Sequence, residues 1–130
     1  MTRYRNLGDL IDRSRPLDDL AIIDLRDAEA PRTLTHSEVD RLANGVARRL
    51  VDLGLERGSH VAIAAANRAE YLIAYFGIMR AGLIAVPINI KAPDTTLDHV
   101  LKDSDARLAF VDAGRRARLE GKLPIVDFDD

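Results

Sequence analysis

The residue types that most often carry chemistry are scattered along this sequence. The three histidines, His36, His60 and His99, have none of the close spacings of a metal-binding motif, and the chain has no cysteine. A metal site would therefore need the fold to gather distant residues, so we predict no metal site and expect these histidines at the surface or at helix ends. Without cysteine there is no disulfide, no thiolate metal site and no cysteine nucleophile.

The glycines do not form a loop that could hold a nucleotide. A dinucleotide fingerprint needs Gly-x-Gly-x-x-Gly, and no two glycines of this chain stand one residue apart. Gly54 and Gly58 have neither the spacing nor the Lys-Ser/Thr ending of a P-loop, and they precede a predicted strand instead of following one. We interpret Gly54 as a helix end and Gly58 as part of a turn.

The charged clusters give only weak signals. Asp112 ends a predicted strand, but a receiver domain needs several carboxylates at strand ends, and the strand that ends at Ala66 has none. Arg115, Arg116 and Arg118 lie close to acidic residues and have no interleaved aromatic residues for base stacking, so we interpret them as a solvated helix face. Motif chemistry alone therefore assigns no catalytic residue.

The composition is that of one ordinary globular domain. The chain has 130 residues, 47% of them hydrophobic and 31% charged, and its formal charge of −2 gives no general attraction to nucleic acid or to an anionic membrane. The longest apolar run, Tyr71 to Met79, is far shorter than the roughly 18 to 20 residues of a membrane span. Because the first ten residues also lack the apolar region of a secretory signal, we expect a cytoplasmic protein.

Hydrophobic periodicity predicts the elements that must position these residues. Thr35 and Glu38 form a capping box at the start of a helix over about His36–Leu53. Further helices are expected after Asn6, over Arg68–Ala81 with Asn67 as its N-cap, from Pro93 onward, and over Gly114–Glu120. Short apolar runs predict strands at His60–Ala66, Leu83–Ile88, Leu108–Asp112 and Pro124–Phe128, and a small N-terminal hairpin of Leu20–Leu25 and Arg32–Thr35.

The order of these elements predicts an α/β fold. Helices and strands alternate at short spacing from Thr35 to Asp112, which is typical of a parallel sheet with right-handed crossovers and flanking helices. The continuous apolar strands predict that both faces of the sheet are covered. Ligands of such sheets bind outside the carboxyl ends of the strands, so the loops after Ala66, Ile88 and Asp112 are the candidate binding region.

A series of short pieces, taken in order, resembles the N-terminal part of the AMP-forming acyl- and aryl-CoA synthetases. The pieces are Leu34-Thr35-x-x-Glu38, Ala43-Asn44-x-Val46-Ala47-x-x-Leu50, Gly54-x-x-x-Gly58-x-x-Val61-Ala62-Ile63, Asn67-x-x-Glu70-Tyr71, Arg80-Ala-Gly-x-Ile84-Ala-Val-Pro-Ile-Asn89 and Leu97-x-x-Val100-Leu101-x-Asp-Ser104. The likeness runs from about Asn6 to Asp112 and lies in the order of the pieces more than in any one of them. This adenylate-forming superfamily also includes the adenylation domains of peptide synthetases and the luciferases.

The resemblance implies an activity and its cofactors. Members of the family use ATP and magnesium to convert a small-molecule carboxylic acid into an acyl-adenylate, and most then transfer the acyl group to coenzyme A. By the same resemblance, Lys91 and Asn89 are the cofactor-binding candidates. A basic residue at the position of Lys91 can contact a phosphate of coenzyme A, and Asn89 is expected to hold the loop through the backbone. His36 and Ile90 depart from the residues common in the family, which leaves the path of the loop after Asn89 open.

The resemblance also implies what this chain lacks. The family's phosphate loop, its ribose-binding acidic residue and the lysine of its C-terminal domain have no counterpart here. We therefore expect residues 1–130 to be the N-terminal piece of the large domain, inactive alone, with the rest of the synthetase as its partner and a tendency to self-associate. The alternative is a free-standing, non-catalytic α/β interaction or regulatory module. The sequence leaves open whether a fatty or an aryl acid is activated and which thiol accepts it.

Overall fold

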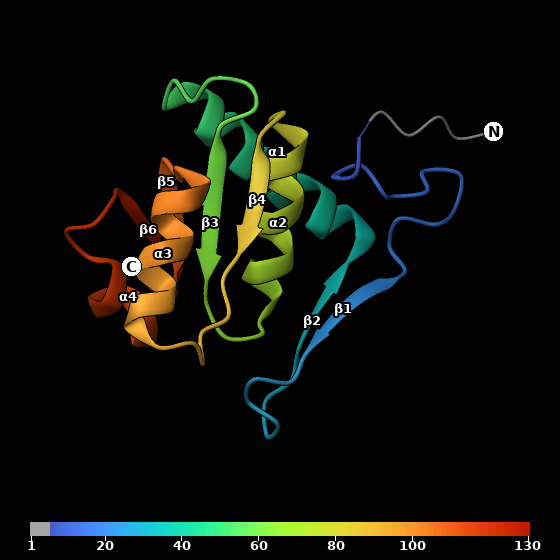
Figure 1. Cartoon of the computed structure of the whole chain (residues 1–130). Coiled ribbons are helices and arrows are strands. Elements are labelled where there is room, and N and C mark those ends of the chain that lie inside the picture. Colours follow the sequence, from blue (N-terminus) through green and yellow to red (C-terminus); the bar gives the residue numbers. More distant parts are fainter. Residues whose placement is uncertain (1–5) are drawn as a thin grey trace.

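Four parallel strands form the central sheet in the computed structural model, which describes residues 6–130 (Figure 1). Their order across the sheet is β4, β3, β5, β6, and every neighbouring pair is parallel. The strands are β3 (His60–Ala64), β4 (Ile84–Pro87), β5 (Leu108–Val111) and β6 (Ile125–Asp127). The predicted α/β class and parallel sheet are confirmed.

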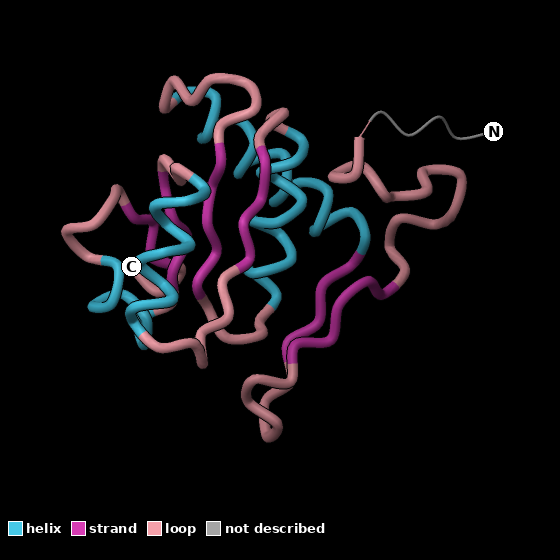
Figure 2. Tube along the Cα trace, viewed as in Figure 1, coloured by secondary structure: helices cyan, strands magenta, loops and turns pink. Residues whose placement is uncertain are grey.

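Helices cover both faces of this sheet (Figure 2). Because successive side chains of a strand point to opposite faces, each strand contributes to the core on either side. Val61 and Ile63 of β3 face α1 (His36–Asp52) and α2 (Ala69–Arg80). The smaller Ala62 and Ala64 face α3 (Asp94–Ser104) and α4 (Ala113–Leu119). Within residues 6–130 no helix combines the length and the hydropathy that a membrane crossing requires.

The first helix forms as its local sequence predicts. The Thr35 hydroxyl accepts a hydrogen bond from the Glu38 backbone N–H, and the Glu38 carboxylate accepts one from the Thr35 N–H, at 3.2 and 2.7 Å. The helix ends at Asp52, and Gly54 two residues later has a left-handed φ of 77°, which suits glycine. The capping box and the glycine helix end are both confirmed.

The N-terminal hairpin consists of β1 (Leu20–Asp24) and β2 (Arg32–Thr35), which pair antiparallel as expected. Buried Leu34 packs with residues of both α1 and α2, including Val39 and Ile73. The hairpin therefore packs against helices α1 and α2 and is separate from the central sheet.

One predicted element is not formed. No helix follows Asn6: its side chain accepts a hydrogen bond from the Gly8 N–H at 2.9 Å, and Gly8 lies so close to the last turn of α2 that a Cβ there would be 2.4 Å from the Phe76 oxygen. β4 is an edge strand, and its first residue, Ile84, is 47% exposed. The next two residues, Ala85 and Val86, pack into the cores on opposite faces of the sheet.

Candidate functional site at the carboxyl edge of the sheet

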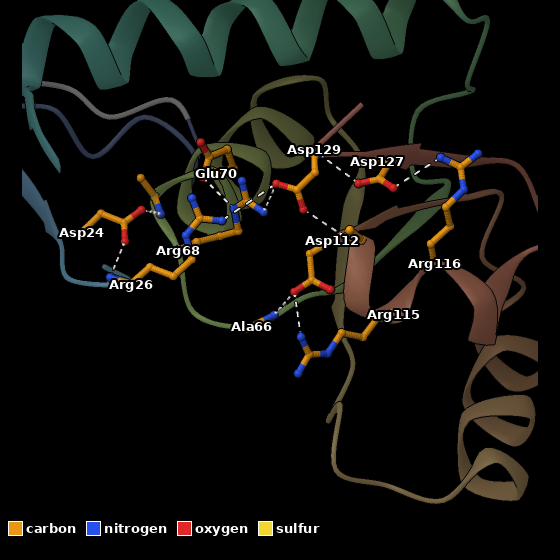
Figure 3. Close-up of polar contacts among 12 residues, drawn as sticks. Asp24, Arg26, Ala66, Arg68, Glu70, Asp112, Arg115, Arg116, Asp127 and Asp129 are labelled. Atoms are coloured by element: carbon orange, nitrogen blue, oxygen red, sulfur yellow. Dashed lines mark hydrogen bonds and ion pairs between the residues drawn. The ribbon is translucent and has the colours of Figure 1, made fainter. Parts of the chain in front are cut away.

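Charged side chains gather at the carboxyl ends of β3, β5 and β6 (Figure 3). They come from the loop between β3 and α2, the start of α4 and the segment after β6. In open α/β sheets, ligands bind just beyond this carboxyl edge. We therefore treat it as the candidate functional site.

Asp112 joins two of the loops that the sequence selected. Its Oδ2 atom accepts hydrogen bonds from the Ala66 backbone N–H at 2.8 Å and from Arg115 Nη1 at 3.0 Å. The side chain is only 8% exposed, and its Oδ1 atom has no hydrogen-bond partner among the described residues. The single carboxylate that looked weak in the sequence thus fixes the end of β5 to the loop after β3.

Arg68 is the buried cation of this edge, with a side chain 4% exposed. It donates from Nε to Glu70 and from Nη1 to Asp129, both at 2.8 Å, and its guanidinium lies 5.4 Å from the centre of the Phe128 ring. Burial opposes the charged form of Glu70, but the hydrogen bond from Arg68 and the nearby Arg32 hold the pKa of that carboxyl below its usual value. Arg68 therefore fastens the segment after β6 to the start of α2.

Asp129 completes the link to α4. One carboxylate oxygen accepts from the Ala113 backbone N–H at 3.0 Å and the other from Arg68. The backbone hydrogen bond, followed by the one from Arg68, holds the pKa of Asp129 below its usual value. The charged form of Asp129 is the one these contacts favour.

The start of α2 is capped by the hairpin. The N-cap residue is Arg68 and not Asn67 as the sequence suggested, and no side chain at the N-cap bonds the first turn. Instead Asp24 of β1 accepts from the Ala69 N–H at 3.0 Å, and its other oxygen accepts from the Arg26 N–H. These two bonds, the one from Ala69 first, lower the pKa of Asp24.

The arginines of α4, which the sequence suggested form a solvated helix face, are partly exposed and each also contacts an acidic or carbonyl group. Arg115 donates to Asp112, and Arg116 Nη1 lies 3.4 Å from a carboxylate oxygen of Asp127. Arg118 donates to the loop between β4 and α3. Arg115 thus bonds the N-cap residue of α4 itself, whereas Arg116 and Arg118 connect α4 to other segments.

The two cofactor-binding candidates lie in that loop, after the carboxyl end of β4. Asn89 Oδ1 accepts a hydrogen bond from the Lys91 backbone N–H at 3.0 Å, so Asn89 does hold the loop through the backbone. The Lys91 side chain is exposed. The histidines stay apart on α1, β3 and α3, and within residues 6–130 no three His, Asp or Glu side chains are grouped to hold a metal ion.

The geometry of this edge can position backbone and present charge. Its carboxylates and guanidinium groups bond to one another, and Asp112 and Asp24 also bind backbone N–H groups 46 and 45 residues away, in the loop after β3 and at the start of α2. These contacts fix loops in place and assemble no catalytic group around a common point. Local sequence patterns could not reveal the roles of Asp24, Arg68, Asp129 and Arg118, because each has at least one partner far along the chain.

Comparison with known proteins defines the class. The family model described as AMP-binding enzyme matches residues 12–128. The match covers nearly the whole chain, so the chain belongs to the AMP-binding enzymes, and the resemblance seen in the sequence is confirmed.

Individual relatives differ in what they make. Adenylate-forming reductase 03009 of Coprinopsis cinerea is 37% identical over 78% of this chain, and the phosphinothricin tripeptide synthetase PhsC of Streptomyces viridochromogenes is 33% identical over 72%. The crystal structure of the anthranilate CoA ligase AuaEII in complex with anthranoyl-AMP is similar over 75% of this chain, with 30% identity and a TM-score of 0.70. The matched regions span 10%, 9% and 20% of those three proteins.

Proposed function

We propose that this chain is the N-terminal part of a cytoplasmic, adenylate-forming acid–thiol ligase. In the proposed reaction a small-molecule carboxylate attacks the α-phosphate of ATP, giving an acyl-adenylate and releasing pyrophosphate, with magnesium bound to the phosphates. The thiol of coenzyme A then attacks the acyl carbon and releases AMP. The observation that carries the proposal is the family match over residues 12–128.

Within that enzyme residues 6–130 would form one wall and supply no catalytic group. The carboxyl edge positions three loops through Asp112, Arg68 and Asp129. The phosphate loop and the C-terminal domain would come from sequence beyond Asp130. This division supports an inactive piece whose main partner is the rest of the synthetase chain.

We also propose that Lys91 contacts a phosphate of coenzyme A in the complete enzyme. The residue follows the carboxyl end of β4, its side chain is exposed, and its backbone is held by Asn89. An ammonium group in that setting is free to pair with a phosphate without first breaking an internal ion pair. Asn89 would act through the backbone of the loop.

The test is acid-dependent exchange of pyrophosphate into ATP by the longest protein that the gene encodes. A panel of fatty, aryl and amino acids reads out the adenylation step alone, and coenzyme A is then added to measure thioester formation. We expect exchange with at least one acid and thioester with coenzyme A. A gene that stops directly after Asp130 would favour the free-standing interaction or regulatory module.

A second acceptor is favoured by one specific observation. The tripeptide synthetase PhsC is 33% identical over 72% of this chain, and the adenylation domains of peptide synthetases pass the acyl group to a carrier-bound thiol. Adenylation without thioester formation on coenzyme A, together with transfer to a phosphopantetheine carrier, would assign the chain to that branch. Both branches share the adenylation step.

A further inference from the structure

Arg118 of α4 forms three hydrogen bonds to the loop that carries Lys91 and to the start of α3. Its Nη1 donates to the backbone oxygen of Ile90 at 2.9 Å and its Nη2 to that of Ala92 at 2.7 Å. Its Nε donates to the Asp94 carboxylate at 2.8 Å. The three acceptors lie 24 to 28 residues from Arg118, so the contact is made by the fold and not by the local chain.

The two carbonyl groups that Arg118 binds flank Lys91 on either side. On its amino side Lys91 is also held by Asn89, which accepts from its N–H. Arg118 therefore holds in place the backbone on both sides of Lys91, from which the Lys91 side chain extends. A guanidinium has five N–H donors in a rigid planar fork, whereas a lysine ammonium has one nitrogen and cannot reproduce this pattern.

We propose that Arg118 is the positioning residue for the coenzyme A contact of Lys91. The inference rests on the proposed function and adds to it a residue that touches no ligand. A lysine on an unrestrained loop samples many directions and loses entropy when it meets a phosphate, so fixing the loop beforehand strengthens the contact. Arg118 accordingly affects binding of coenzyme A and leaves adenylation unaltered.

The activity test compares Arg118→Gln with Arg118→Lys in the longest protein the gene encodes. Both variants raise KM for coenzyme A, by about fivefold for glutamine, the size expected when one exposed charge-assisted contact is lost. The KM for ATP in pyrophosphate exchange stays at the wild-type value. In a Lys91→Ala background Arg118→Gln raises KM no further, because Arg118 acts only through Lys91.

Arg107→Gln is the matched control. Arg107 also pairs with one aspartate, Asp105, but it lies before β5, at the opposite edge of the sheet. The backbone N–H of Ala92 donates to the backbone oxygen of Asn89, and its rate of hydrogen exchange gives a readout that is independent of activity. Exchange there quickens in Arg118→Gln and stays unchanged in Arg107→Gln.

Should Arg118→Gln fail to fold, Asp94→Asn replaces it, since it weakens the same set of contacts from the exposed start of α3. A raised KM for coenzyme A in that variant supports the inference, and an unchanged KM overturns it. A wild-type KM in a folded Arg118→Gln, or an additive effect with Lys91→Ala, overturns it while leaving the ligase intact. A wild-type protein that makes adenylate but no coenzyme A thioester overturns the proposed function itself.

Discussion

The carboxylate of Asp24 accepts a hydrogen bond from the backbone N–H of Ala69, 45 residues further along the chain. The first turn of α2 is thus capped by a strand of the hairpin and not by its own N-cap residue. The contact joins two regions that also meet through apolar packing of Leu34 and Ile73 and through the ion pair of Arg32 with Glu70. Asp24 therefore stabilises both the helix start and the seating of the hairpin.

Replacing Asp24 with alanine should lower the free energy of unfolding by about 1–2 kcal/mol, since a buried helix cap is lost. Urea unfolding at neutral pH measures the change. Asp27→Ala serves as the control, because Asp27 lies in the exposed hairpin turn and its carboxylate accepts from the backbone N–H of Glu29, two residues away. The control should stay within about 0.5 kcal/mol of the wild type.

The stabilisation from Asp24 should depend on pH in a defined direction. Its folded-state pKa is lowered from 3.8, first by the hydrogen bond from Ala69 and then by that from Arg26. A lowered pKa means that the contribution is complete well above pH 3.8 and is lost as the pH falls through the folded value. The stability gap between wild type and Asp24→Asn should narrow from pH 5 to pH 2.5; a constant gap would contradict this assignment.

Patterns local in sequence predicted the fold well, and contacts between distant segments explain the misses. The Thr35 and Glu38 capping box, the Gly54 helix end and the strands around Ala62 and Ala109 all depend on residues within a few positions of one another. Asp24 and Arg118 depend on partners that only the assembled fold brings near. Most of the candidate site lies in that second group.

Gly77 of α2 lies against Val46 of α1, and a Cβ at position 77 would be 2.5 Å from the Val46 Cβ. Gly77→Ala should therefore force the helices apart and lower the free energy of unfolding by about 1–3 kcal/mol. Gly45→Ala is the matched control, because a Cβ there meets nothing within 4 Å and lies in the middle of α1. It should raise stability by about 0.5–1 kcal/mol through helix propensity. Equal effects of the two variants in thermal unfolding would refute the close approach.

The 130-residue chain alone should self-associate through an apolar groove between the hairpin, α1 and the ends of β5 and β6. Leu42, Val46, Phe110, Val126 and Phe128 are among its lining residues. The adjacent β6 is an edge strand with unpaired backbone groups.

Light scattering against concentration measures this association. Leu42→Lys places a charge in the groove wall and should shift association to higher concentration. Leu53→Lys changes an exposed leucine outside the groove and should leave association as in the wild type. A wild-type monomer across the whole concentration range would rule the interface out.

Residues 1–130 alone should release no pyrophosphate from ATP above background with any acid of the panel. The described edge fixes loops but presents no cluster of groups that could position and neutralise three phosphates. Sustained acid-dependent turnover by the isolated chain would show that the division of labour proposed for it is mistaken.

The contacts of Arg68 and Arg118 lie at the carboxyl edge of the sheet, and the opposite edge has quite different turns. There Gly58 and Gly82, both with positive φ, let the chain turn tightly, and the Gly58 N–H donates to the Gly82 oxygen. Exposed Glu56 lies in this neighbourhood, before the start of β3. A fluorescent label or an affinity tag attached at position 56 would therefore lie on the side of the molecule opposite the candidate site. The protein could be immobilised through this position with the candidate site left accessible.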